Sequence, residues 1–369
     1  MNTKHVDAIA KAVLYEGYML YPYRPSSVKN RQRFNFGVLY QKSYSEAQSG
    51  SDAWSMQTEC LVQEDSVQGD PAQGDPLQEF VTVIEVKLRF LKLVDRSVHQ
   101  LSRQALEHFP ADSNRFDSVP MITTDDRAIA PWQEAIECEV NLPPCKLDGI
   151  AASPLEWKFS FPAKQGTEPL CDESGRLIGS IERRQDLVEG VVEAQAVAVG
   201  ERLFKVQIRV KNLTSVDKDN GQITREAALM RSLVSAHVLL GVNGGQFVSL
   251  LEPPENLREM AGDCRNIGVW PVLVGNEGSH DTMLASPIIL YDYPQIAPES
   301  PGDLFDGTEI DEILALRILT MTDEEKQEMR QSDERARKML ERTESLPMEY
   351  VMKLHGTLRE LRPSKEEMP

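Results

Sequence analysis

Two long segments of the chain alternate apolar and polar side chains, and this period of two constrains the fold more than any other feature. Residues 80–94 and 203–213 place Val, Ile, Leu and Phe at alternate positions, with Lys, Arg, Glu and Gln between them. The pattern is typical of a β-strand with one face in the core and the other in solvent. We therefore predict two strands of one β-rich core. The alternation slips by one residue near Ile84, which predicts a β-bulge there.

Further runs of β-branched and aromatic residues extend this β-rich pattern. Residues 191–199 are joined to the strand at 203 by Gly200 and Glu201, as in a β-hairpin. Residues 225–240 instead space their apolar side chains as in a helix, and Gly241 is placed to end it. The remaining runs predict strands at 34–40, 54–62, 246–251, 267–274 and 286–291. The expected fold class is α+β, with a mainly antiparallel β-rich body and a C-terminal helical tail.

The chain is expected to have three parts. Residues 1–290 form the β-rich body, interrupted at 63–78 by a mobile insertion rich in Gly, Pro, Asp and Gln. Residues 291–306 contain three prolines and predict an extended strap. Residues 307–369 are expected to be helical. Within them, Thr322 and Glu325 have the spacing of a capping box, which predicts a helix reaching about Glu344.

Charge and hydropathy exclude several classes of function. The 369 residues include 58 acidic and 40 basic side chains, for a net charge of -18. Such an anionic surface argues against general nucleic-acid binding, which depends on Lys and Arg at phosphates. The sequence has neither a secretory signal pattern nor an apolar run long enough to cross a bilayer, so we expect a cytoplasmic protein without membrane insertion. Its five cysteines contain no Cys-x-x-Cys pair, so their spacing predicts no disulfide framework.

One segment has the residue types of a metal site. Cys264 and His280 lie at the two ends of a predicted strand and turn, and Asp281 follows directly. A thiolate, an imidazole and a carboxylate suit Ni, Zn or Fe, and a Cys-His pair also suits nucleophilic catalysis. His237 is a candidate third ligand. The alternative interpretation is a structural cysteine beside a histidine on a surface turn.

Two other regions have the residue types of a partner-binding surface. Arginine and lysine beside tyrosines can hold an acidic surface by charge-assisted hydrogen bonds, although a solvated loop with local ion pairs explains them too. The Pro-rich strap adds aromatic side chains for docking. The candidate partner-binding residues are Tyr21, Tyr23, Arg24, Lys29, Arg31, Arg33, Tyr293 and Phe305.

The common nucleotide and hydrolase signatures are missing. The chain contains no phosphate-binding loop, no dinucleotide fingerprint, no nucleophile elbow and no His-Glu-x-x-His motif. The sequence therefore leaves the catalytic residues unknown and predicts no cofactor, with Ni, Zn or Fe at the candidate metal site as the alternative.

Several of these segments resemble one group of proteins. The runs REAALMRSLVSAHVLLGV, CRNIGVWPVLVG and SPIILYDYPQIAPESPGDLFDGTEIDEILALRILTMTDEEKQEMRQSDERAR are similar to conserved uncharacterised proteins encoded alongside uptake NiFe-hydrogenase structural and maturation genes. The N-terminal LYEGYMLYPYRPSSVKNRQRFNFGVLY resembles the start of the same proteins. The resemblance implies a role in hydrogenase assembly, maturation or electron-transfer support, and it supplies no catalytic motif.

Two functional hypotheses follow. The first is a non-catalytic accessory protein that binds a hydrogenase subunit or a maturation protein. The alternative is a metal-dependent enzyme or metal carrier that uses Cys264, His280 and Asp281.

Overall fold

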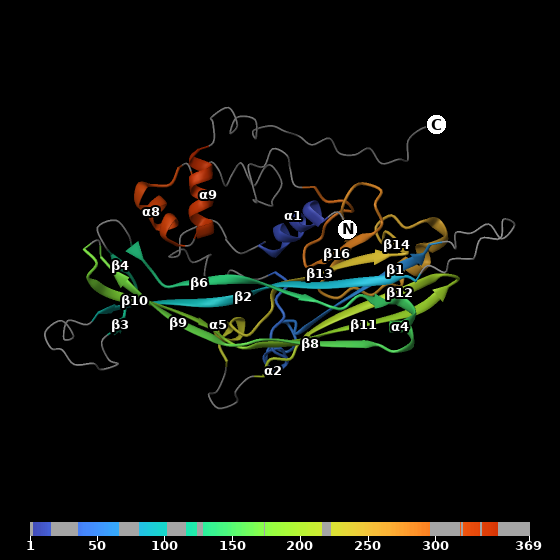
Figure 1. The fold of residues 1–369 in the computed structure, drawn as a ribbon, viewed down its shortest axis with the longest axis horizontal. Helices are drawn as coiled ribbons and strands as arrows, with labels where there is room; N and C mark the ends of the chain where they lie inside the picture. The colour runs from blue at the N-terminus through green and yellow to red at the C-terminus, as the bar shows by residue number, and fades with distance from the viewer. Residues whose placement is uncertain are drawn as a thin grey trace. The chain divides into compact units, whose positions relative to one another are not determined.

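The computed structural model divides the chain into two compact units. One unit, called the body below, comprises residues 1–20 and 31–295, and the other, the C-terminal unit, comprises residues 21–30 and 296–369. The residues that the structure describes are 3–15, 36–65, 81–101, 116–123, 128–172, 174–215, 223–295, 318, 320–332 and 334–345. They form a mainly antiparallel β protein with two main sheets and few short helices (Figure 1).

The first sheet of the body has five strands in the order β14-β1-β12-β11-β8. Each pair in it is antiparallel, and the β11–β12 hairpin predicted at Gly200 and Glu201 is confirmed. The alternating segment at 203–213 forms β12, the middle strand. The strands are β1 (Ser55–Glu64), β8 (Leu155–Phe161), β11 (Val188–Gly200), β12 (Leu203–Asn212) and β14 (Gly245–Phe247).

The second sheet is built around one long strand, β2 (Val83–Leu101). Its main order is β15-β16-β13-β2-β10-β9, and β3, β6 and β7 also pair with β2. One edge of β2 pairs first with β13 and then with β10, because neither partner is long enough to follow all of it. The other strands are β3 (Phe116–Ser118), β6 (Trp132–Asn141), β7 (Cys145–Lys146), β9 (Lys164–Cys171), β10 (Leu177–Gln185), β13 (Val234–Asn243), β15 (Trp270–Leu273) and β16 (Thr282–Ser286). A separate pair joins β4 (Ile122–Thr123) to β5 (Ala128–Ile129).

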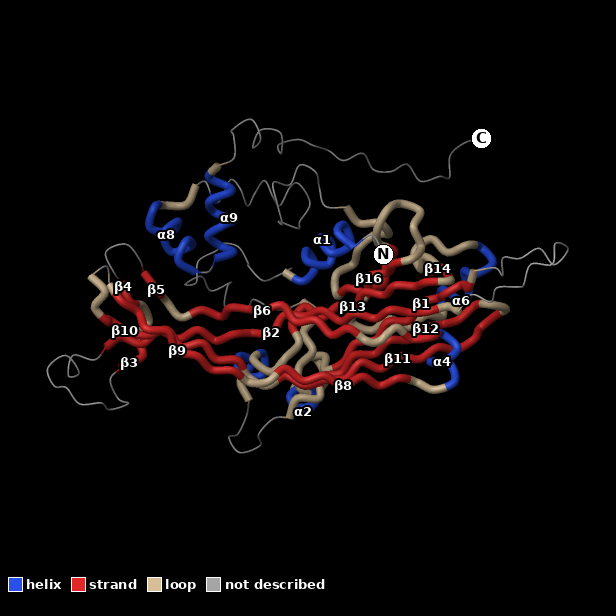
Figure 2. Tube along the Cα trace, viewed as in Figure 1, coloured by secondary structure: helices blue, strands red, loops and turns tan. Residues whose placement is uncertain are grey.

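The two sheets share one hydrophobic core. Val206, Ile208 and Val210 on β12 belong to the same buried cluster as Val86 and Leu88 on β2. The prediction that the two alternating segments contribute to one core is therefore confirmed, although they lie in different sheets (Figure 2). Burial of alternate side chains from both sheets is the main source of stability for such a fold.

Short helices and loops cover the outer faces of the sheets. Leu14 of α1 packs with Leu91 and Leu93 of β2 on the face turned away from the shared core. On the first sheet, Ala261 of α6 packs against Leu61 and Leu203. The helices of the body are α1 (Thr3–Leu14), α2 (Lys42–Ala47), α4 (Leu147–Ala152), α5 (Arg225–Leu229), the 3-10 helix η4 (Glu255–Leu257) and α6 (Arg258–Gly262). None of the helices among the described residues has the length and apolar character needed to cross a bilayer.

The helix predicted at 225–240 is wrong for most of its length. Helix α5 ends at Leu229, and β13 begins at Val234. Residues 234–242 are all buried, since β13 has covered faces on both sides. A continuously apolar run of this kind has no clear period, so helix and strand are hard to distinguish from sequence. Gly241 does not end a helix but pairs with Thr282 and Glu85 within the sheet.

Other predicted boundaries also change. Burial on β2 alternates regularly through Ile84, and the bulge lies instead on β13, between Val234 and His237. The predicted insertion begins too early, because Gln63 and Glu64 belong to β1; residues 66–80 lie outside the described residues. The segment expected as a strand at 34–40 contributes one β-bridge, from Leu39 to Leu233. The strand expected at 286–291 lies earlier, as β16.

The C-terminal unit contains α8 (Asp323–Ser332) and α9 (Glu334–Glu344). The capping box at its start is confirmed: the Thr322 amide donates to Glu325 Oε2 at 2.8 Å, and the Glu325 amide donates to Thr322 Oγ1 at 3.3 Å. These bonds satisfy donors that the first turn of a helix leaves free. Lys326 and Arg330 on α8 form ion pairs with Glu344 on α9, so charges join the two helices. The strap predicted at 291–306 lies mostly outside the described residues.

Gly190 on β11 provides a test of the packing in the first sheet. A methyl group on its Cα would lie 2.4 Å from Cζ of Phe159 and 2.8 Å from the carbonyl oxygen of Lys211. We expect Gly190→Ala to lower the free energy of unfolding by about 1–3 kcal/mol, measured by urea denaturation, because the neighbours must shift. Gly166 on β9 is the matched control, since nothing lies within 4 Å of its added carbon. Equal losses in the two variants would contradict this packing.

Candidate functional site

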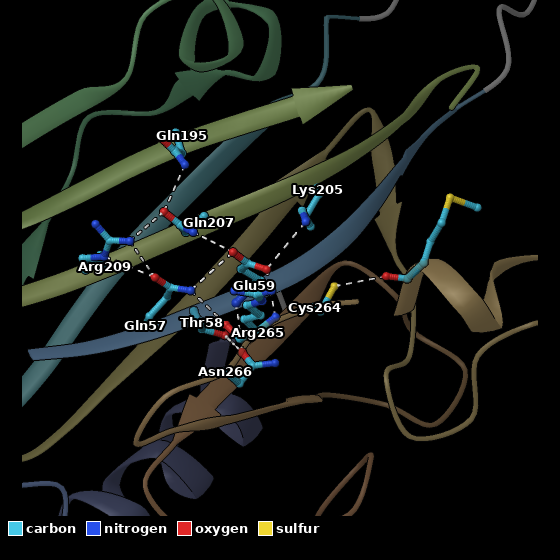
Figure 3. Close-up of polar contacts among 11 residues, drawn as sticks. Gln57, Thr58, Glu59, Gln195, Lys205, Gln207, Arg209, Cys264, Arg265 and Asn266 are labelled. Carbon is cyan, nitrogen blue, oxygen red and sulfur yellow. Dashed lines mark hydrogen bonds and ion pairs between the residues drawn. The ribbon is translucent and has the colours of Figure 1, made fainter. Parts of the chain in front are cut away.

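The predicted metal ligand Cys264 lies just beyond α6 and has a structural environment. Its thiol donates to the carbonyl oxygen of Met260 at 3.6 Å (Figure 3). The side chain packs against the small cluster of Leu61, Leu203 and Ala261. Burial raises the pKa of the Cys264 thiol to about 11, with the nearby Glu59 carboxylate acting in the same direction. A protonated thiol of this kind is a poor nucleophile and a poor metal ligand.

His280 and Asp281 form hydrogen bonds with nearby protein groups rather than with each other or with Cys264. His280 Nδ1 donates to the carbonyl oxygen of Phe247 at 3.0 Å. The Asp281 carboxylate accepts hydrogen bonds from Ser279 at 3.0 Å and Thr282 at 2.8 Å. No three His, Cys, Asp or Glu side chains gather as a metal-binding group anywhere in the described part of the chain. The structure therefore does not bring Cys264, His280 and Asp281 together as a ligand set.

His237, the candidate third ligand, is fully buried on β13. Its Nδ1 donates to the carbonyl oxygen of Ser235 at 2.9 Å, and its Nε2 has no hydrogen-bond partner among the described residues. Ser235 has a φ of 53°, in the left-handed region, and its hydroxyl donates to the carbonyl oxygen of Val13 on α1. His237 thus belongs to the bulge that receives the end of α1.

Of the predicted partner-binding residues, the structure describes only Tyr293. Its amide donates to the carbonyl oxygen of Leu273 at 2.7 Å, and Leu273 in turn donates to Asp292 Oδ1 at 2.7 Å. Tyr293 packs partly buried against the shared core, so it anchors the chain along β15. The others, Tyr21, Tyr23, Arg24, Lys29, Arg31, Arg33 and Phe305, lie outside the described residues.

A polar network on the outer face of the first sheet surrounds the buried carboxylate of Glu59 (Figure 3). Glu59 accepts hydrogen bonds from Gln207 Nε2 at 2.6 Å, from the Arg265 amide at 2.8 Å and from Gln57 Nε2 at 3.3 Å. Lys205 lies 3.8 Å away as an ion-pair partner. Because the amide comes from the loop after α6, the carboxylate holds that loop on the sheet.

The network continues across β12 and β11. Arg209 donates to Gln57 Oε1, at 2.7 Å through Nη2, and pairs with Glu193, which also binds Lys211. Asn266 Oδ1 accepts from the Thr58 hydroxyl and the Glu59 amide, each at 2.9 Å. The residues of this network are bonded to one another, so the network fixes the loop on the sheet. The sequence did not predict it, because its members lie far apart in the chain and only the alternation of polar residues marked them.

A cavity of about 290 Å³ lies on another part of the body. Its polar lining includes Tyr40, Asp52 and Arg225, and Gly37 and Gly268 also line it. Burial raises the pKa of Tyr40 to about 12, and its hydroxyl is hydrogen-bonded to Arg225. Arg225 and Asp52 offer opposite charges to a small polar molecule, and neither Ser51 nor Ser55 in the lining has a histidine beside it in the cavity wall.

Large apolar side chains are exposed around the edge strand β15 and its neighbour β16. Ile267 and Trp270 lie at the start of β15, and Ile289 and Tyr291 follow the end of β16. These two strand ends are paired through Trp270 and Ser286. Ile289 is 73% exposed and Tyr291 is 86% exposed. Large exposed apolar side chains are candidates for contact with a partner, and we call these four residues the β15–β16 surface.

Comparison with known proteins does not place the chain in a family. No protein-family model matches the sequence, and no curated protein is significantly similar to it.

The environment of Cys264 predicts low reactivity. With a pKa of about 11, only about 0.1% of this thiol is ionised at pH 8. We expect iodoacetamide to modify the exposed Cys171 at least about 10-fold faster than Cys264 in the folded protein. Peptide mapping after timed labelling measures both rates, and denatured protein is the control in which they converge. Rapid labelling of Cys264 in the native state would show that it is a reactive site.

Proposed function

We propose that this chain is a non-catalytic cytoplasmic accessory protein that supports assembly or maturation of a NiFe-hydrogenase by binding a hydrogenase subunit or maturation protein. The context comes from the resemblance of its segments to proteins encoded with uptake NiFe-hydrogenases. The observation that carries a binding role is the β15–β16 surface, where Ile267, Trp270, Ile289 and Tyr291 expose apolar area beside a short edge strand. Aromatic and aliphatic anchors of this kind supply much of the binding energy in protein interfaces.

The surface also has a defined scaffold. Pro271 removes one backbone donor from β15, and Asp292 and Tyr293 occupy the backbone groups of Leu273. The strand is therefore poorly suited to pair with another strand, so its side chains rather than its backbone are available to a partner. We propose that the strap at 291–306 and the helical tail at 307–369, which includes α8 and α9, also contribute to partner binding.

Affinity purification from the native cell, with mass spectrometry, tests the proposal. We expect the wild-type protein to capture a hydrogenase subunit or maturation protein, and the triple variant Trp270→Ser, Ile289→Ser, Tyr291→Ser to lose most of it. Val197→Ser with Leu213→Ser is the matched control, because these exposed apolar residues lie elsewhere on the body. Capture that is equal in all three proteins would reject this surface, and absence of every hydrogenase component would reject the function.

No observation among the described residues favours the alternative of a metal-dependent enzyme or metal carrier. Metal analysis of the purified protein tests it independently. Stoichiometric nickel, zinc or iron that is lost in Cys264→Ser would replace the proposed function by that alternative.

A further inference from the structure

The outermost strand of the first sheet, β8, has an unpaired edge. Among the described residues it pairs with β11 on one side and with no strand on the other (Figure 2). Its seven residues contain neither proline nor glycine, which are common means of blocking an exposed edge. A free edge of this length presents a row of backbone donors and acceptors to another strand.

The core-facing side of β8 is apolar and incompletely covered. Leu155, Phe159 and Phe161 pack against the shared core, and Phe161 meets Phe90 edge to face with ring centroids 5.3 Å apart. Trp157 lies in the same row but is 39% exposed. An exposed tryptophan in the row that faces the core indicates that the sheet has room for one more strand beside β8.

The opposite side of β8 carries two charges that lack partners within the described chain. Glu156 and Lys158 are exposed, and neither side chain forms an ion pair or hydrogen bond with a described residue. Glu156 lies opposite Glu193 of β11, a like charge that is itself paired with Arg209 and Lys211. The sheet therefore leaves Glu156 without a cation and Lys158 without an anion.

We propose that β8 pairs with β8 of a second copy of this chain, antiparallel and centred on Trp157. This two-fold arrangement places Glu156 opposite Lys158 of the second copy, and Lys158 opposite its Glu156. On the core-facing side, Trp157 meets its own counterpart and Leu155 meets Phe159. Both faces of the strand are then self-complementary, and the two five-stranded sheets join into one continuous sheet.

Neighbouring registers do not satisfy both faces. A shift of one residue sets the apolar row of one copy against the charged row of the other, because successive side chains point to opposite faces. A shift of two residues sets Glu156 against Glu156, or Lys158 against Lys158, and like charges directly opposite each other are destabilising. The register centred on Trp157 is the one that pairs unlike charges and apolar side chains together.

The edge is also held in place before any second copy binds. The buried Lys92 ammonium on β2 donates to the carbonyl oxygens of Phe161 at 3.2 Å and Pro162 at 2.8 Å. These bonds fix the end of β8, where the chain leaves the first sheet for β9 in the second. A preorganised edge loses little conformational entropy when another strand is added.

Charge reversal tests the register. We expect the wild-type chain to be a dimer at micromolar concentrations by light scattering and sedimentation velocity. Glu156→Lys alone and Lys158→Glu alone each create two like-charge pairs, and each should raise the dimer dissociation constant at least 10-fold. The double variant Glu156→Lys, Lys158→Glu restores unlike pairs and should return the constant to near the wild-type value. Glu201→Lys and Lys146→Glu are controls with the same charge changes at exposed positions outside β8.

A cysteine at the two-fold axis gives a second test. In a Cys171→Ser background, Trp157→Cys brings two thiols to directly opposite positions, where Cα atoms lie about 4.5–5.5 Å apart and a disulfide can form. Mild oxidation should give a covalent dimer, whereas Ser160→Cys, which lies away from its own counterpart, should form little covalent dimer. A monomeric wild-type chain, single charge variants that dimerise as well as wild type, or a second protein bound along β8 in place of a second copy would each overturn the proposal. None of these results depends on whether a hydrogenase component is captured.

Discussion

Phe90→Ala is expected to lower the free energy of unfolding by about 3–5 kcal/mol. Phe90 has no exposed surface, and its ring contacts Phe161 edge to face and lies 6.0 Å from Phe159, centroid to centroid. Removing it leaves a cavity between the two sheets that the rigid strands cannot fill by collapsing. Urea denaturation followed by tryptophan fluorescence and circular dichroism measures the loss.

The matched control for this substitution is Phe116→Ala on β3. Phe116 is 37% exposed and lies at the end of the second sheet, so its removal should cost under about 1 kcal/mol. Phe90→Leu should lose less than Phe90→Ala because it keeps most of the buried volume. Equal losses for Phe90→Ala and Phe116→Ala would show that the aromatic cluster between the sheets does not hold them together.

Acidification is expected to weaken the protein through His237. Burial lowers the pKa of His237 to about 4, and the neighbouring Arg89 guanidinium acts in the same direction, whereas the bond to Ser235 opposes it. In the unfolded chain the imidazole has its ordinary pKa near 6.5, so the unfolded state takes up the proton first. The stability that neutral His237 contributes to the folded state is fully present above pH 6.5. It is lost as the pH falls from 6.5 to 4, which lowers the free energy of unfolding by an amount on the order of 3 kcal/mol.

His237→Asn separates this effect from the titration of carboxylates. Asparagine can keep the donor to the Ser235 carbonyl oxygen but cannot take up a proton in this range. Between pH 7 and pH 4, the wild-type protein should lose about 3 kcal/mol more stability than the variant, measured by urea denaturation at each pH. If the free energy of unfolding depended on pH in the same way in the two proteins, His237 would not be held neutral in the folded state.

The parts of the fold that could be predicted were those in which one face of a strand is in the core. β12 alternates polar and apolar residues, and Gly200 and Glu201 separate it from the apolar residues of β11, so the hairpin was predicted correctly. β13 was not predicted, because it is covered on both faces and its residues from Val234 to Val242, mostly apolar or small apart from His237, show no clear period. Local capping of α8 was predictable because Thr322 and Glu325 are three residues apart.

The candidate site, in contrast, could not be predicted from the sequence. Cys264, His280 and Asp281 have suitable chemistry but bind local partners, which only the fold decides. The Glu59 network joins β1 to β12 and to the loop at Arg265, residues that no short motif connects. The self-complementary pattern of β8 was present in the sequence, but its meaning depends on the position of β8 at the end of a sheet.

The central position of β2 has a consequence for synthesis of the chain. Ile84 pairs with Val242, so part of one edge of this nineteen-residue strand has no partner until roughly 150 more residues have been synthesised. At about 5–20 residues per second, translation leaves that apolar edge uncovered for roughly 10–30 seconds. The second sheet is therefore completed late in synthesis, and a nascent chain that stops before β13 leaves this part of the β2 edge unpaired. Newly made protein should accordingly depend on chaperones that hold unpaired strands apart until Asn243 has emerged.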